Sequence, residues 1–573
     1  MFDKFQPKTE REWIEQANKE TRTFESISFP HLFQLENLKL SAINTYQSAN
    51  SNKKLVKYII SNKSAYPSIS LMLAEQLKKV EFESILQYGL EDLFLTLDQA
   101  LSSQIIDKSS NSPELQSIAV TYEHSDSNGL ASFVERFVKE QRLNMTLYNS
   151  LLISRASGLS NQQTADLAIL INKYHNDQIQ LLGIRGDILG NYGATVVQEL
   201  AASLSLLVAQ WDILTNQGVS IASLVAQTEL ALSLSGEFYL DIVKFKAARV
   251  LIYYLLDAYE TEDTNPNQVK LRAISGTLNK SLYDPDANLL RNTVESLAAT
   301  VGEADIITLR SHDYQYRQTT EFGSRMAANI QHLFRHEASL HETKNPADGS
   351  YFFEKAIDDV VKQAWELFQA IEGEGGYYQS GLTDATLCFR PNTRKKEREL
   401  LQQKKAVIGV TRYANIQEKI TENQVADRTN SPSQIKLWED TRQRVDNLSE
   451  DKKPVLTILG PLNADKSIVR KKITFVIEIL ATIGLPDFTV DNSLETILEK
   501  GRPDVLIFCG DNAWYESHLV ETTSHPELTS VPKVAVGKMS LLVKLQQEKV
   551  LDAVIHSRAD LSPLFNVIKQ VLP

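Results

Sequence analysis

The sequence predicts an α/β protein in which a (β/α)8 barrel of the TIM type precedes a smaller flavodoxin-like, Rossmann-type domain. Three observations support this prediction. Short apolar runs alternate with longer amphipathic helical patterns through most of the chain, a polar stretch then interrupts them, and a shorter alternation follows. Repeated strand–helix alternation is typical of a barrel of parallel strands. A doubly wound sheet fits the same alternation, so the pattern alone favours the barrel only modestly.

Residues 1–50 are predicted to form an N-terminal arm. They are polar, and the stretch from Gln47 to Lys54 is made mainly of Ser, Asn and Lys, which is typical of a loop. The arm has too little chain to bury its aromatic side chains, which are Phe2, Phe5, Trp13, Phe24, Phe29 and Phe33. We therefore expect the arm to wrap around a partner protein.

Residues 51–385 are predicted to form the barrel, because they contain eight short runs rich in strand-forming residues. The predicted strands are Leu55–Ser61, Asp92–Asp98, Ser117–Glu123, Leu143–Tyr148, Ile179–Arg185, Glu229–Ser235, Leu271–Ser275 and Asp305–Leu309. Apolar residues recur at helical spacing between them, most clearly at Gly193–Thr215, Gly236–Tyr259, Ala287–Val301 and Phe322–Leu340.

Residues 386–453 are predicted to be a linker, because they have hardly any sustained apolar face. Their basic cluster, Arg394-Lys395-Lys396, is compatible with a phosphate site. However, Glu397 and Glu399 are interleaved with it at helical spacing. This arrangement favours a solvated helix with internal ion pairs.

Residues 454–573 return to strand–helix alternation and are predicted to form the flavodoxin-like domain. The predicted strands are Val455–Leu459, Val505–Phe508, Lys533–Val536 and Ala553–Ile555, with a helix at Ile468–Ile483. In such sheets a ligand binds outside the carboxyl ends of the strands. We therefore expect any ligand of this domain in the loop that begins at Gly460.

The composition excludes several classes of function. The chain has 573 residues, of which 42% are hydrophobic and 23% charged, as in folded globular proteins. Sixty Lys and Arg residues against 72 Asp and Glu residues give a formal net charge of −12, which disfavours nucleic acid and anionic membranes as partners. The longest apolar run, Ile473 to Leu485, is interrupted by Glu478 and is too short to span a membrane. Without an apolar signal core at the start, we expect a cytoplasmic location.

Metal chemistry finds little support in the sequence. The two cysteines, Cys388 and Cys509, lie far apart without a CxxC pattern, and we expect reduced, buried thiols. His332 and His336 are four residues apart, but Glu337 follows the second histidine instead of the first, unlike the zincin pattern. We therefore predict no metal site, although this pair of histidines suits adventitious metal. Spacing also assigns no nucleophile–base constellation.

Several stretches resemble the end of the methylmalonyl-CoA mutase barrel. Phe322–Gln331, Asn345–Tyr351 and Ala364–Gly376 are similar to the family patterns R-x-A-R-N-x-Q, D-P-x-G-G-S-Y and A-W-x-L-x-x-x-I-E-x-x-G-G. Asn288–Asn292 resembles N-L-L-R-x-T, and Ala406–Tyr413 resembles V-G-V-N-x-Y. The resemblance runs in consistent order through most of the chain.

This resemblance implies a substrate-binding barrel followed by a cobalamin-binding domain. The family ligates cobalt through the histidine of D-x-H-x-x-G, with the aspartate orienting that imidazole. In this chain the corresponding residues are Asp465, Ser467 and Arg470. A serine hydroxyl is a poor cobalt ligand, and arginine in place of glycine crowds the cofactor tail. We therefore expect a degenerate cobalamin-binding-like domain, with no cofactor bound by this chain.

The barrel shows a parallel loss. Gly186–Thr195 resembles the family's G-Y-H-x-Q-E-A-G-A-T, and Ile188 stands at the position of the histidine that contacts the substrate carbonyl. Isoleucine cannot donate a hydrogen bond to a thioester oxygen. We therefore expect no catalytic residues in this chain.

Loss of both imidazoles is the pattern of the small, non-catalytic β subunit of heterodimeric methylmalonyl-CoA mutase. The resemblance implies a large (α) subunit as partner, which binds adenosylcobalamin and interconverts succinyl-CoA and methylmalonyl-CoA. Two alternatives remain at this point. One is an active acyl-CoA mutase with an unusual or absent lower cobalt ligand, for which His518 and His525 lie in the right domain. The other is a metallochaperone-like module built around His332 and His336.

Overall fold

The computed structural model describes residues 33–35, 38–40, 67–73, 88–96, 119–124, 145–149, 161–174, 179–260, 265–316, 320–382, 384–420, 425, 433–449, 452–461, 467–557 and 559–572. These residues form a mixed α/β fold with parallel sheets, which confirms the predicted fold class at that level. Within these ranges no helix combines the length and the apolar character needed to cross a membrane. By its internal contacts the chain divides into two compact units, which are described separately below.

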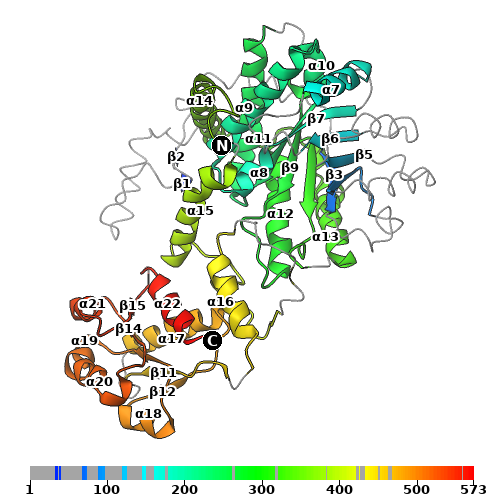
Figure 1. The fold of residues 1–573 in the computed structure, drawn as a ribbon. Coiled ribbons are helices and arrows are strands. Elements are labelled where there is room, and N and C mark those ends of the chain that lie inside the picture. The colour runs from blue at the N-terminus through cyan, green and yellow to red at the C-terminus, as the bar shows by residue number, and fades with distance from the viewer. Residues whose placement is uncertain are drawn as a thin grey trace, which may run out of the picture. The chain divides into compact units, whose positions relative to one another are not determined.

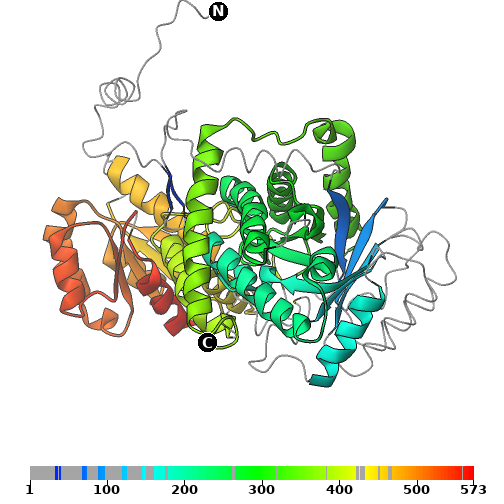
Figure 2. The same cartoon turned by 90° about the horizontal axis from the view of Figure 1, so that it is seen from above.

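Unit 1 consists of residues 1–276, 289–312 and 319–390 and contains a closed barrel of eight parallel strands. In spatial order β10 lies between β9 and β3, so the last strand closes onto the first. The strands are β3 (Ser68–Leu73), β4 (Asp92–Thr96), β5 (Ala119–His124), β6 (Met145–Asn149), β7 (Ile179–Arg185), β8 (Thr228–Leu234), β9 (Lys270–Ser275) and β10 (Ile306–Arg310). Figure 1 and Figure 2 show helices packed around these strands.

The helices of unit 1 follow the strands in the chain. They are α7 (Asn161–Lys173), α8 (Gly186–Asn191), α9 (Val196–Thr215), α10 (Ile221–Gln227), α11 (Phe238–Ala258), α12 (Asp286–Val301), α13 (Glu321–His332) and α14 (Tyr351–Gly373). Local sequence fixes where α9 begins, because Thr195 and Gln198 form a reciprocal capping box. Glycine supplies the left-handed residue at Gly193, where φ is 104°.

Seven of the predicted barrel strands overlap strands of the structure, and the first one differs. The first barrel strand is β3, which starts after Pro67, whereas the predicted strand Leu55–Ser61 lies outside the described residues. The alternation of Ser and apolar residues in β3 places Ser70 inside the barrel, where it is fully buried. Short serine-containing strands give a weaker apolar signal than a continuous apolar run. Of the predicted arm, only β1 (Phe33–Leu35) and β2 (Leu38–Leu40) are described, and they pair antiparallel.

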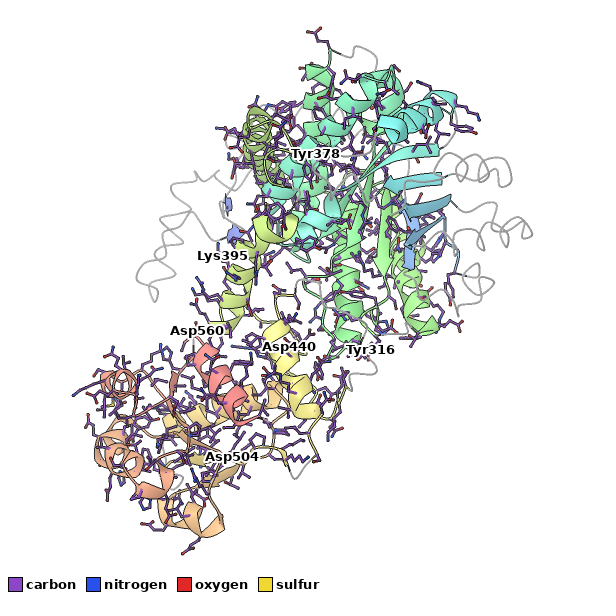
Figure 3. The ribbon with its side chains drawn as sticks, in the orientation of Figure 1. Tyr316, Tyr378, Lys395, Asp440, Asp504 and Asp560 are labelled. Carbon is purple, nitrogen blue, oxygen red and sulfur yellow. The ribbon has the colours of Figure 1, made fainter. Side chains whose placement is uncertain are left out.

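Unit 2 combines residues 391–573 with two short segments, 277–288 and 313–318. Its five-stranded parallel sheet has the order β12-β11-β13-β14-β15. The strands are β11 (Leu456–Leu459), β12 (Thr489–Asp491), β13 (Val505–Phe508), β14 (Lys533–Val536) and β15 (Ala553–Ile555). Its main helices are α16 (Lys436–Asp446), α17 (Ser467–Thr482), α18 (Leu494–Lys500), α21 (Ser540–Gln547) and α22 (Ser562–Val571). Figure 3 labels Asp504, whose side chain accepts a hydrogen bond from the Val455 amide beside this sheet, and Asp560, which precedes α22.

The residues predicted as a linker contain structure of their own. Helix α16 lies within 386–453, and helix α15 (Ala385–Leu401) begins one residue before this range. Trp438 is 2% exposed and packs edge to face on Phe565, with ring centroids 4.9 Å apart. A few large apolar side chains, widely spaced in a polar sequence, are therefore enough to anchor this stretch in the core of unit 2.

Candidate functional site

The carboxyl end of β7 is the first candidate site, because it carries Ile188. Strand β7 runs directly into the short helix α8, without a loop between them. Leu189 of α8 is fully buried, whereas Ile188 is half-buried and packs against the main core of unit 1. The residue that the sequence marks as a lost histidine is therefore an apolar contact at the end of the barrel where active sites of this architecture lie.

Two glycines allow α8 to pack closely. A Cβ atom at Gly186 would collide with the side chain of Ser203 and would lie 2.8 Å from the Ala231 carbonyl oxygen. A Cβ at Gly190 would collide with the Ser233 hydroxyl. Close packing of α8 therefore requires glycine at both positions.

A buried ion pair lies at the same end of the barrel. The Arg185 Nε donates to Asp187 Oδ1 at 2.6 Å, and its second amino group donates to Oδ2 at 2.9 Å. The Asp187 side chain is fully buried, and the Arg185 guanidinium lies 5.3 Å from the centre of the Phe94 ring. In this bidentate pair both oxygens of the Asp187 carboxylate accept a charge-assisted hydrogen bond.

A second charged cluster lies in the barrel interior, also near Phe94. The Arg272 guanidinium lies 5.4 Å from the centre of that ring, donates to Glu229 at 2.5 Å and donates to Asp92 at 2.6 Å. It also donates to Thr308 at 2.8 Å. Phe94 itself packs in an apolar cluster of the interior with other strand residues. The described part of the barrel axis is therefore occupied by side chains.

A third buried cluster ties the end of β8 to its neighbouring helices. Lys244 of α11 lies 2.9 Å from the Glu199 carboxylate and 3.5 Å from that of Asp241. The Asp241 carboxylate also accepts hydrogen bonds from the Ser235 and Gly236 amides just after β8. Burial raises the pKa of Asp241 to about 6, an effect that Lys244 opposes. Burial also raises the pKa of Glu199.

Replacing Asp241 with Asn is expected to flatten the pH dependence of stability. The pKa of Asp241 is higher in the folded chain than in the unfolded chain. The stabilisation of the fold that comes from this shift is therefore complete below about pH 4 and is lost as the pH rises through about 6. The shift corresponds to about 2–3 kcal/mol. Denaturant unfolding from pH 4 to 7 should show a smaller decline for Asp241→Asn than for the unmodified chain. Asp257→Asn, on the exposed face of the same helix, is the matched control, and an unchanged decline in Asp241→Asn would contradict the assignment.

The histidines predicted as a possible metal pair lie elsewhere in unit 1. His332 and His336 stack with ring centroids 5.7 Å apart, and His332 Nε2 lies 2.7 Å from the Tyr88 carbonyl oxygen, before the start of β4. This is the amino end of the strands. Among the described residues, no group of three or more His, Cys, Asp or Glu side chains could hold a metal. His312, which no sequence motif singles out, follows β10 at the carboxyl end and is buried edge-on to Phe322.

The carboxyl edge of the sheet in unit 2 is the second candidate site. The strand order reverses between β11 and β13, and this is where ligands bind in open parallel sheets. The two strands are followed by Gly460 and Cys509, which approach each other so closely that a Cβ at Gly460 would collide with the Cys509 carbonyl oxygen. Cys509 is fully buried, as the sequence predicts, and burial raises the pKa of its thiol to about 12. Cys388, in contrast, is exposed.

Side chains of unit 2 converge at this edge. The Lys472 ammonium of α17 donates to the Gly510 carbonyl oxygen at 2.6 Å and lies 4.8 Å from the centre of the Tyr515 ring. The Tyr515 hydroxyl lies 2.9 Å from the Phe508 carbonyl oxygen and 2.8 Å from that of Val536. Tyr515 therefore bridges the carboxyl ends of β13 and β14. Burial lowers the pKa of Lys472.

The predicted cofactor residues are only partly described. Ser467 is the first residue of α17, and Arg470 lies one turn later with an exposed side chain. Asp465 lies outside the described residues. His518 stacks on Trp514 with ring centroids 5.4 Å apart, and His525 precedes a short 3-10 turn.

Taken by its described parts, the chain is an α/β protein with a closed parallel barrel and a second parallel sheet. The family described as methylmalonyl-CoA mutase matches residues 156–476, which is more than half of the chain. The chain belongs to the methylmalonyl-CoA mutase family. The family that the sequence motifs indicate is thereby confirmed.

Several relatives carry the small-subunit name. The methylmalonyl-CoA mutase small subunit of Porphyromonas gingivalis is 26% identical over 42% of this chain and 39% of its own length. The probable small subunit of Mycobacterium bovis is 26% identical over 62% of this chain and 59% of its own. The methylmalonyl-CoA mutase of Escherichia coli is 28% identical over 40% of this chain and 33% of its own. The matched part thus spans less than two thirds of each of these relatives, and the names of the first two agree with the sequence-based assignment.

Proposed function

We propose that this chain is the small, structural subunit of a heterodimeric, adenosylcobalamin-dependent methylmalonyl-CoA mutase and carries no catalytic residues itself. The observation that carries the proposal is Ile188, an apolar core contact at the carboxyl end of the barrel in a chain of this family. The partner in this proposal is the large subunit, which performs the interconversion of succinyl-CoA and methylmalonyl-CoA. The small-subunit names of the relatives support this assignment.

The finer fold assignment is part of the same proposal. We assign the barrel of unit 1 to the TIM type, since eight parallel strands close in a ring with helices after them. We assign the sheet of unit 2 to the flavodoxin-like type, since its strand order has the pattern 2-1-3-4-5. We also propose a cytoplasmic location.

The carboxyl edge of unit 2 does not fit the tail of a cobalamin. The Tyr515 ring and the Lys472 ammonium lie against the carboxyl ends of β13 and β14, at the edge of the sheet where such a ligand would enter. Displacing Lys472 would break its short hydrogen bond to Gly510. The half-buried ammonium would then lack a hydrogen-bond partner, which costs free energy. Together with the serine at position 467, this packing supports the proposal that the chain binds no cobalamin.

Co-expression with a large subunit from the same genome tests the proposed role. We expect the two chains to elute as one complex from gel filtration, with mutase activity that depends on the large subunit. If the small chain elutes alone and the large subunit is fully active without it, the proposal is wrong. Radical rearrangement of an acyl-CoA by the isolated small chain would instead support the alternative, an active mutase with an unusual or absent lower cobalt ligand.

Restoring the missing histidine is expected not to restore cofactor binding. Because Tyr515 and Lys472 lie at the edge of the sheet where the ligand would enter, Ser467→His should remain free of cobalamin after incubation and desalting, as judged by visible absorbance. The large subunit, treated in the same way, is the positive control. Stoichiometric cobalamin in either the unmodified chain or Ser467→His would contradict the proposed packing block.

A further inference from the structure

A pocket of about 280 Å³ lies within unit 2, away from the carboxyl edge of its sheet. It is lined by the loop after α15 and by residues of α16, α17 and the start of α22. Its volume corresponds to roughly nine water molecules of liquid, since each takes about 30 Å³. The pocket therefore has room for a small organic molecule.

One wall of the pocket is apolar and fixed. Trp438 is 2% exposed and is held by its edge-to-face contact with Phe565. Ile479 of α17 is 8% exposed, and Leu561 is 2% exposed. Because these side chains are already packed into the core, only their edges face the pocket, and the half-buried Phe475 adds accessible apolar surface. A wall that is already ordered binds an apolar group at little further cost in side-chain entropy.

The loop that forms the opposite wall is held in a defined shape. The Gly409 amide donates to the Arg412 carbonyl oxygen at 2.8 Å, and the Thr411 hydroxyl accepts a hydrogen bond from the Val407 amide at 2.9 Å. Gly409 has a φ of 82°, and a Cβ there would collide with the Asp284 carboxylate. This turn positions the two residues that follow Thr411, and both Arg412 and Tyr413 line the pocket.

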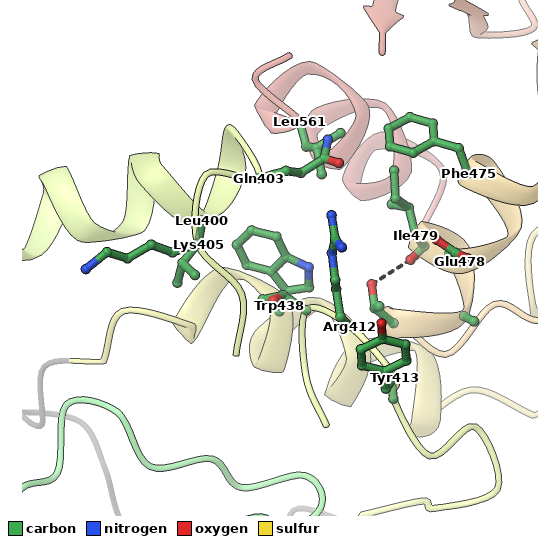
Figure 4. A pocket seen from close by; sticks show the side chains of 14 residues that line it. Leu400, Gln403, Lys405, Arg412, Tyr413, Trp438, Phe475, Glu478, Ile479 and Leu561 are labelled. Atoms are coloured by element: carbon green, nitrogen blue, oxygen red, sulfur yellow. Dashed lines mark hydrogen bonds between the residues drawn. The ribbon is translucent and has the colours of Figure 1, made fainter. Parts of the chain in front are cut away.

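Three charged side chains line the pocket, namely Lys405, Arg412 and Glu478. Arg412 and Glu478 are both exposed and do not pair with each other. Figure 4 shows the Arg412 side chain extending between the Trp438 ring and α17, which carries Glu478. Within the described part of the chain, neither the Arg412 guanidinium nor the Glu478 carboxylate forms a hydrogen bond or an ion pair. A guanidinium binds carboxylates with paired hydrogen bonds, and a carboxylate binds ammonium groups. A ligand carrying both charges can bridge two groups that are too far apart to pair directly.

We propose that this pocket binds a free α-amino acid with an apolar side chain. Arg412 binds its carboxylate, Glu478 binds its ammonium group, and the wall around Trp438 receives its side chain. The inference does not depend on the proposed subunit role, because it rests only on residues within unit 2. Amino acid binding would give the chain a ligand that is unrelated to acyl-CoA or cobalamin.

Calorimetric titration of the full chain with L-leucine tests the proposal. We expect one saturable site, and we expect Arg412→Gln and Glu478→Gln each to weaken binding by about tenfold or more, the effect of removing one hydrogen bond to a charged group. Arg444→Gln on α16 and Glu499→Gln on α18 are matched controls, since both side chains are exposed and lie outside the pocket. Both controls should bind as the unmodified chain does.

Two analogues separate the contributions of the charges. 4-Methylpentanoate keeps the carboxylate and lacks the ammonium group, whereas 3-methylbutylamine keeps the ammonium group and lacks the carboxylate. Both should bind more weakly than L-leucine. The proposal is overturned if neither L-leucine nor L-phenylalanine binds. It is also overturned if 4-methylpentanoate binds as tightly as L-leucine, or if both pocket variants bind normally. Circular dichroism of each variant checks that the fold is retained.

Discussion

Replacing Arg272 with Ala is expected to lower the free energy of unfolding by about 3–5 kcal/mol. Arg272 is fully buried and donates to two carboxylates, Glu229 and Asp92, and the substitution leaves both of them in the barrel interior without a cation. A buried charge that has lost its partner is among the most destabilising changes in proteins. Urea denaturation at neutral pH, followed by far-ultraviolet circular dichroism, measures the loss.

The matched control for this substitution is Arg390→Ala, which removes an exposed arginine from the same unit and should change stability by less than about 0.5 kcal/mol. Equal stability of Arg272→Ala and Arg390→Ala at neutral pH would show that the interior cluster does not support the barrel.

Replacing Tyr283 with Ala is expected to destabilise unit 2 by about 3–5 kcal/mol, the range for large aromatic side chains removed from a core. Tyr283 is 1% exposed, its ring centre lies 4.1 Å from the Arg442 guanidinium carbon, and its hydroxyl donates to Asp446 at 2.7 Å. The buried Arg442 would lose its aromatic partner and face a cavity. Thermal unfolding, monitored by tryptophan fluorescence, should show the loss.

Two further variants apportion the effect of Tyr283. Tyr283→Phe keeps the ring and removes only the hydroxyl, so it should destabilise by about 1 kcal/mol. Tyr413→Ala removes a tyrosine that is 80% exposed and should be nearly neutral. If Tyr283→Phe is as damaging as Tyr283→Ala, the hydrogen bond to Asp446 is the main contribution and the stacking on Arg442 is not.

Periodicity predicts those parts of the fold in which an apolar run is continuous. Strands β7, β13, β14 and β15 begin and end at the predicted residues or within one of them, since their buried runs have clear polar limits. Strand β12 (Thr489–Asp491) is missed, because three residues that include Thr and Asp carry no apolar signal. The helix α16 within the predicted linker is missed for a similar reason, because Trp438 anchors a helix whose sequence is otherwise polar.

Sequence patterns likewise identify some residues of the candidate sites and miss others. Motif spacing identifies Ile188 and Ser467, because a missing histidine is visible in a one-dimensional pattern. Spacing cannot identify Lys472 and Tyr515 as side chains that lie at one edge of the sheet, because they come from different helices and meet only when the sheet forms. It also cannot pair Arg412 with Glu478 across a pocket, since the two residues are far apart in the sequence and share no motif.

Unit 2 is built from three separate stretches of the chain, and this has a consequence for how the protein can be recombined. Segments 277–288 and 313–318 belong to unit 2, although in the sequence they lie between elements of the barrel unit. Tyr283 and Tyr316 meet there, where the Tyr316 hydroxyl donates to the Leu282 carbonyl oxygen at 3.1 Å (Tyr316 is labelled in Figure 3). Residues 391–573 therefore do not form a self-contained domain. A chimera that exchanges them for those of a relative has to import both inserts as well, or it replaces a matched core with two mismatched halves.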